Sequence, residues 1–113
     1  MKPRNRSAVL LCGLFAAGCG GVIAMGAVTD VGDQYRAGEC ARVLELVDEY
    51  LPFLTDHPTE LAEVYLYKGK CLSRMERTEE AKAAFSYVSE QHPDTPFAYE
   101  ARAMLRQFEP DAP

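Results

Sequence analysis

The sequence predicts an all-α fold of about five helices behind an N-terminal signal segment. From residue 24 onward, apolar residues recur at spacings of three and four, which is the period of amphipathic helices. No useful stretch alternates apolar and polar residues as a half-buried strand would. The length of 113 residues allows one small domain in addition to a targeting segment.

The N-terminus has the layout of a bacterial secretory signal. Basic residues lie in the first six positions, and residues 8–18 form an uncharged apolar run that ends in small residues before Cys19. Ala17-Gly18-Cys19 resembles the lipobox of bacterial lipoproteins. The resemblance implies that residues 1–18 are a signal peptide and that Cys19 carries the lipid (a palmitate-type anchor). Gly20, rather than Asp, implies passage to the outer membrane.

Two alternatives stay open for this segment. Residues 8–28 contain no charge and are numerous enough to span a bilayer as a helix, which would anchor an uncleaved chain in the inner membrane. The third alternative is a soluble secreted protein. Each of the three delivers the domain across the inner membrane.

Turn residues divide the rest of the chain into the predicted helices. Residues 19–23 are expected to be a tether, and residues 24–108 the helical domain. Pro52 is expected to kink or loosen the end of the second helix, and the Pro-rich residues 109–113 form a tail. The predicted helices cover residues 24–37, 39–55, 60–75, 78–91 and 97–108.

Residues 62–93 resemble a tetratricopeptide repeat (TPR). Gly69, Ala81, Phe85 and Pro93 fall where that repeat has its Gly, Ala, Phe and Pro. The two His-Pro pairs lie 35 residues apart, close to the repeat period. The resemblance implies a short right-handed stack of two helical hairpins and a closing helix. The residues with repeat-signature packing roles would be Tyr65, Gly69, Leu72, Ala81, Phe85 and Pro93.

Cys40 and Cys71 are candidates for a disulfide. If residues 39–55 and 60–75 pack antiparallel around the turn near His57, the two cysteines differ in distance from that turn by three residues, or about 4.5 Å along the axis. An exported compartment permits the bond. The alternative is two buried thiols.

Charge and motif content point away from enzymes and nucleic-acid binders. From residue 19 onward the chain has nine Lys and Arg against seventeen Asp and Glu, a net charge of −8, which disfavours nucleic acid as the partner. The two histidines each precede a Pro and lack the spacing of metal ligands. No nucleophile elbow or phosphate loop is present. We therefore expect no enzymatic activity, no metal and no cofactor.

The expected function is a protein–protein interaction or scaffold module on the periplasmic side of the bacterial envelope, such as an accessory subunit of an assembly or secretion complex. The TPR resemblance implies that the first helix of each repeat lines a concave face. The alternatives are a structural lipoprotein that self-associates as a homo-oligomer, a regulatory subunit of an enzyme, and a solvated helix face without a partner. The predicted partner-binding residues are Glu63, Leu66, Tyr67, Lys70 and Arg74.

Overall fold

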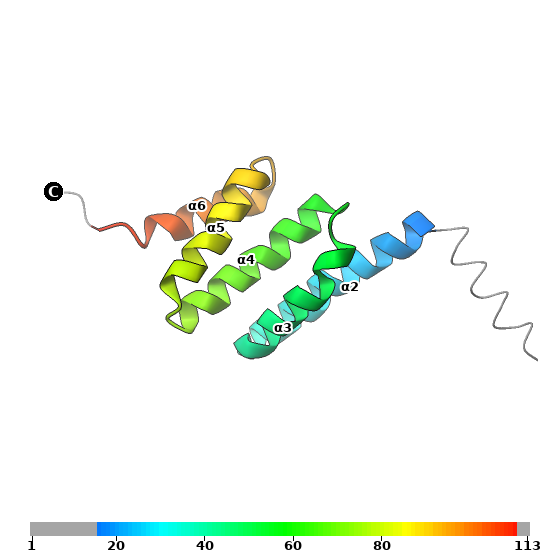
Figure 1. Ribbon diagram of the computed structural model, residues 1–113, viewed down its shortest axis with the longest axis horizontal. Coiled ribbons are helices and arrows are strands. Elements are labelled where there is room, and N and C mark those ends of the chain that lie inside the picture. The colour runs from blue at the N-terminus through cyan, green and yellow to red at the C-terminus, as the bar shows by residue number, and fades with distance from the viewer. Residues whose placement is uncertain (1–15, 111–113) are drawn as a thin grey trace, which may run out of the picture.

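The computed structural model describes residues 16–110, with side chains from residue 20 onward. This part of the chain is all-α, as the sequence predicts (Figure 1). Most of the predicted signal peptide, the Cys19 side chain and residues 111–113 lie outside the described part. The helices are α2 (Ala16–Arg36), α3 (Cys40–Tyr50), the 3₁₀ helix η1 (Leu51–Phe53), α4 (Pro58–Arg74), α5 (Thr78–Gln91) and α6 (Pro96–Arg106).

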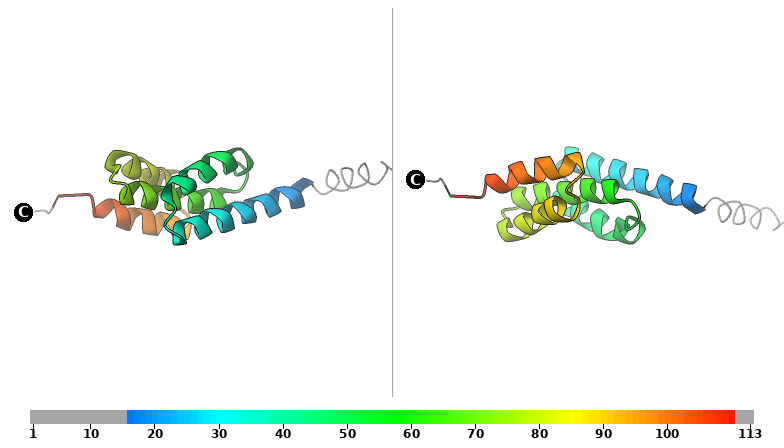
Figure 2. Two further views of the ribbon diagram at one scale, coloured as in Figure 1. Left: turned by 90° about the horizontal axis from the view of Figure 1, so that it is seen from below. Right: turned by 90° about the horizontal axis from the view of Figure 1, so that it is seen from above.

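Helix α4 is the central element of the fold. It packs against α2 and α3 on the N-terminal side of the domain and against α5 and α6 on the C-terminal side. Successive helices also pack on each other, α2 on α3 and α5 on α6. The views in Figure 2 show α2 and α6 on one side of α4 and α3 and α5 on the other. The described chain is therefore a row of helical hairpins with α4 in the middle.

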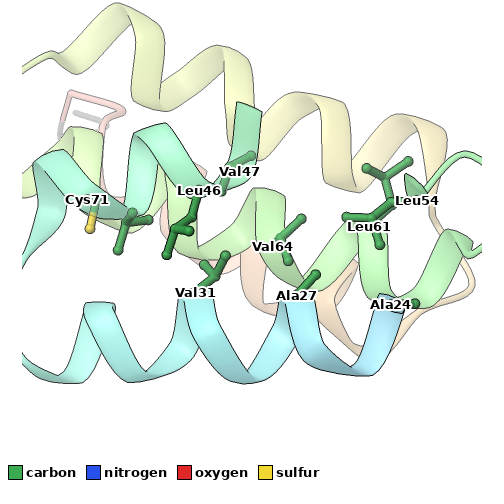
Figure 3. Packing of buried hydrophobic residues seen from close by; sticks show 10 residues of the cluster. Ala24, Ala27, Val31, Leu46, Val47, Leu54, Leu61, Val64 and Cys71 are labelled. Atoms are coloured by element: carbon green, nitrogen blue, oxygen red, sulfur yellow. The ribbon is translucent and has the colours of Figure 1, made fainter. Parts of the chain in front are cut away.

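Two hydrophobic clusters form the core, and α4 contributes to both. In the first cluster, Ala24, Ala27 and Val31 of α2 point toward Leu61 and Val64 of α4 (Figure 3). The second cluster joins α4 to α5 and α6. Because α4 contributes apolar side chains to both clusters, unfolding of this one helix would disrupt both of them. The buried residues of the second cluster are Ala62, Leu66, Leu72, Ala81, Ala84, Phe85, Val88, Ala98 and Ala101.

Helix α5 approaches α4 closely at Gly69. A Cβ atom at this position would lie 2.6 Å from Cε1 and 2.8 Å from Cδ1 of Phe85. The Phe85 ring is fully buried, so it has little room to move away. Gly69 is therefore required for the packing of α4 on α5, although glycine costs about 1 kcal/mol relative to alanine inside a helix.

Two predicted boundaries differ from the observed ones by more than two residues. The expected tether, residues 19–23, belongs to α2, because no proline interrupts the run and the packing of Ala24 and Ala27 supports a continuous helix. The helix expected over residues 39–55 ends at Tyr50. The chain there tightens into η1, since Pro52 has no N–H to continue the α-helical ladder.

Cys40 and Cys71 join the first turn of α3 to the end of α4. Their Cα atoms are 5.1 Å apart and their sulfur atoms lie at disulfide-bonding distance. Cys71 is fully buried within the first cluster. The geometry is thus compatible with the predicted bond, whose formation in the cell stays a prediction.

Replacing Gly69 by alanine is expected to destabilise the domain by about 1–3 kcal/mol, because the added methyl group clashes with the immobile Phe85 ring. Gly26→Ala is the matched control, since a Cβ at that helical position meets no atom within 4 Å. The control should be neutral or stabilised by up to about 1 kcal/mol. Urea unfolding of both variants measures the difference, and equal stability of the two would contradict the close approach.

Reduction of the Cys40–Cys71 pair is expected to lower the free energy of unfolding by about 2–4 kcal/mol, because the bond limits the unfolded chain. Intact mass and thiol titration of protein isolated from the envelope show whether the bond is present. Two titratable thiols at residues 40 and 71 before reduction would show that the bond does not form.

Candidate partner-binding surface

One partly exposed side of α4 is a narrow polar stripe. Glu63, Tyr67, Lys70 and Arg74 follow each other at spacings of three and four residues, so they share one face of the helix. Neighbouring helices cover much of the rest of α4, apart from a second partly exposed side that includes Tyr65 and Lys68. The stripe runs between α2 and α6, which flank α4 on this side of the domain (Figure 2).

Tyr35, from the last turn of α2, is the residue around which this surface is built. Its ring lies 5.1 Å from the ring of Tyr67, measured between centroids. The guanidinium carbon of Arg74 lies 4.1 Å from the Tyr35 ring centroid, and the Lys70 ammonium group 5.7 Å from it. Arg74 also donates a hydrogen bond of 3.5 Å to the Tyr35 carbonyl oxygen. We call Tyr35, Tyr67, Lys70 and Arg74 the tyrosine–cation surface.

The two cations of the tyrosine–cation surface differ in how far they are neutralised. Lys70 forms an ion pair with Glu100 of α6, and only 21% of its side chain is exposed. Arg74 is exposed and stacks on Tyr35. Because stacking uses the face of the guanidinium group and leaves most of its in-plane N–H groups in solvent, Arg74 can still bind a carboxylate in bidentate fashion.

Leu66 does not belong to the exposed stripe, contrary to the prediction. It is only 4% exposed and packs in the second cluster with Ala98 and Ala101 of α6. The prediction came from the TPR resemblance, in which the first helix of each repeat lines a concave face, whereas here Leu66 packs against α6. Leu66 contributes to packing and is not available to a partner.

Glu63 lies at the other end of the stripe and is partly buried. Burial raises the pKa of its carboxyl group, and the neighbouring charge of Glu60 raises it further. Glu63 lines a hollow of about 200 Å³ between α2 and α4, together with Met25, Val28, Thr29 and Glu60. Glu63 therefore differs in charge and in surroundings from the cations at the opposite end of α4.

Tyr35 and Glu100 were missed by the sequence analysis. The first predicted hairpin showed no TPR signature in its first helix, so nothing in the sequence aligned Tyr35 with α4. Glu100 lies in a helix expected only to close the stack. The available signal was that Glu100 is the only carboxylate in residues 97–108, but no pattern aligned that helix with Lys70.

Of the remaining repeat-signature residues, four are buried or partly buried, whereas Pro93 is exposed, contrary to its predicted packing role. Leu72, Ala81 and Phe85 are buried, and Pro93 follows the end of α5. Tyr65 is partly buried, with its ring centroid 4.4 Å from that of Tyr87. These two rings line a hollow of about 290 Å³ on α4 and α5, together with Lys68, Leu72, Glu80, Ala83 and Ala84.

The two histidines lie at helix ends. His57 precedes α4, and His92 follows α5 with its ring centroid 5.4 Å from that of Tyr87. The Nε2 atom of His92 is buried without a hydrogen-bond partner. Within residues 16–110 no three potential metal ligands cluster together. No helix in this range has the length and apolar character needed to cross a bilayer.

Comparison of the chain with known protein families, with curated proteins and with solved structures finds no match.

Proposed function

We propose that this chain is a non-enzymatic protein–protein interaction module with a TPR-like stack of hairpins, held on the periplasmic side of the bacterial envelope. The tyrosine–cation surface is the observation that carries the proposal. It combines residues from α2 and α4 and is tied to α6 through Glu100. A surface assembled from three helices presents a fixed arrangement of groups to a partner.

The composition of this surface indicates the chemistry of the partner. Tyr and Arg are enriched in the centres of protein interfaces, because they offer a large contact area together with hydrogen-bonding groups. On a domain with a net charge of −8, Arg74 provides a local exposed positive charge, while Lys70 beside it is paired with Glu100. A partner segment that carries a carboxylate next to an apolar or aromatic side chain would complement it.

The placement in the envelope is supported by the sequence of the N-terminus. Residues 1–18 have the order of a lipoprotein signal, and Cys19 follows as the residue to be lipidated. The outer membrane is the favoured location, and an inner-membrane anchor formed by residues 8–28 is the alternative. The disulfide geometry of Cys40 and Cys71 suits an oxidising compartment.

A structural, self-associating lipoprotein is the second candidate function. The observation that favours it is Tyr99 on α6, whose side chain is 73% exposed on the last helix of the stack. Exposed aromatic residues at a stack end can pair with another copy. Molar mass from light scattering at two concentrations separates the candidates, because self-association predicts a mass that increases with concentration.

The double substitution Lys70→Glu/Arg74→Glu is expected to weaken partner capture at least tenfold, because it reverses both charges of the tyrosine–cation surface. Crosslinking in intact cells followed by pulldown from solubilised membranes provides the measurement. Lys82→Glu/Arg106→Glu is the matched control, since it makes the same change in net charge on α5 and α6.

The folded state of both double variants is checked by their thermal unfolding midpoints. Capture of the same partner by wild type and by Lys70→Glu/Arg74→Glu would contradict the proposed surface. Equal loss from both double variants would show a general charge effect and would contradict it as well.

Globomycin, which blocks lipoprotein signal cleavage, is expected to make the full-length precursor accumulate. Cys19→Ser should do the same, because it removes the thiol that receives the lipid. Cys12→Ser is the matched control and should be processed normally. Electrophoretic mobility of the chain in membrane fractions gives the result, and normal processing in the presence of globomycin would contradict the lipoprotein assignment.

A further inference from the structure

The first half of α2 is apolar on two opposite faces. Ala24 and Ala27 are buried against α3 and α4, with 1% and 0% of their surfaces exposed. On the outward face, Val22 is 70% exposed and Met25 is 68% exposed, with Ile23 at the edge at 37%. A helix that packs on one side and meets water on the other would carry polar residues at these outward positions.

The outward face of α2 becomes polar farther along the helix. Thr29, Asp30 and Asp33 are all exposed, and Asp33 pairs with Arg36 at 2.6 Å. The change from apolar to polar therefore occurs within one turn, after Met25. This change coincides with the end of the uncharged stretch of the sequence, because Asp30 is the first charged residue after Arg6.

A second element exposes an apolar side chain at the same end of the domain. Phe53 in η1 is 53% exposed, and η1 packs against α2. The following loop lies beside the start of α2, since the Nε2 atom of His57 is 3.4 Å from the position of a Cβ at Gly20. Large apolar side chains from two elements thus gather where the apolar N-terminal segment enters the domain.

The spacing along α2 leaves little distance between the lipid attachment point and the domain. Cys19 precedes Ala24 by five residues, which is about 7.5 Å along a helix. The structure shows α2 as helical across this interval, so no flexible tether separates them. A lipid on Cys19 would hold the domain directly at the bilayer surface, with the start of α2 in the interfacial region.

We propose that Val22, Ile23 and Met25 of α2, together with Phe53 of η1, form a lipid-docking end that inserts into the interface of the bilayer. The inference depends on the membrane placement in the proposed function but not on the tyrosine–cation surface. Interfacial segments bury their apolar side about 5–10 Å into the boundary between headgroups and acyl chains. The first turns of α2 extend far enough along the helix axis to reach this depth in the bilayer.

The charges near the lipid-docking end favour zwitterionic over anionic lipid. Glu60 and Glu63 line a hollow next to Met25, and Asp56 follows Phe53 in an exposed turn. An anionic headgroup would be repelled by these carboxylates. Insertion should therefore be driven by apolar contact and be insensitive to salt.

The chain contains no tryptophan, so a single introduced tryptophan reports on one position. Met25→Trp and Phe53→Trp test the lipid-docking end, and Tyr99→Trp on α6 is the matched control, because all three positions are exposed. The lipidated chain that begins at Cys19 is purified from membranes and reconstituted into phosphatidylcholine–phosphatidylethanolamine vesicles with and without brominated phosphatidylcholine. Brominated lipid should quench the first two variants at least twofold and leave the Tyr99→Trp variant unchanged.

Equal quenching of Met25→Trp and Tyr99→Trp in vesicles that carry the protein would overturn the lipid-docking end while leaving the membrane placement intact. Failure of the chain to float with vesicles would contradict both. A blue-shifted emission of Met25→Trp without lipid, together with a dimeric mass, would assign this end to a second copy of the chain instead.

Discussion

The contact between Gly69 and Phe85 determines how closely α5 packs on α4, the helix that both halves of the domain share. Because Gly69 has no side chain, α5 can pack directly against the backbone of α4, and the Phe85 ring fills the space. The other side of α4 packs on α2 and α3 through Leu61 and Val64. One helix therefore links two small clusters, and neither cluster is complete without it.

The central position of α4 also limits where a partner can bind it. Neighbouring helices cover much of its circumference, which leaves the stripe between α2 and α6 and the side of Tyr65 and Lys68 that lines the hollow on α5. Tyr35 reaches this stripe from α2 and holds Arg74 by stacking and by a hydrogen bond. A stacked cation loses less conformational entropy on binding than a mobile one, since part of its ordering has already occurred. The packing of the fold and the candidate surface thus depend on the same helix.

Much of the fold could be predicted from local patterns, because helix periodicity and proline positions are local properties. The TPR resemblance gave Gly69 and Phe85 packing roles, and the structure places the Phe85 ring against Gly69. The burial of Leu66 could not be predicted, because it depends on α6 covering an edge of α4 from elsewhere in the chain. Tyr35 was missed for the same reason, as its contacts join helices that share no sequence signal. The continuation of α2 through residues 19–23 could not be predicted, because Gly20 and Gly21 weaken the local preference for a helix. Packing in the folded domain tolerates these glycines.

Amide hydrogen exchange measured residue by residue tests most directly the claim that α4 links both halves. If the two clusters share this helix, the amides of Val64–Leu72 should exchange only through global unfolding and be the slowest in the domain. Those of α2 and α5 should exchange at the same rate or faster. Exchange of α4 through local opening, while the amides of α5 or α2 stay protected, would contradict the claim that the two clusters depend on α4.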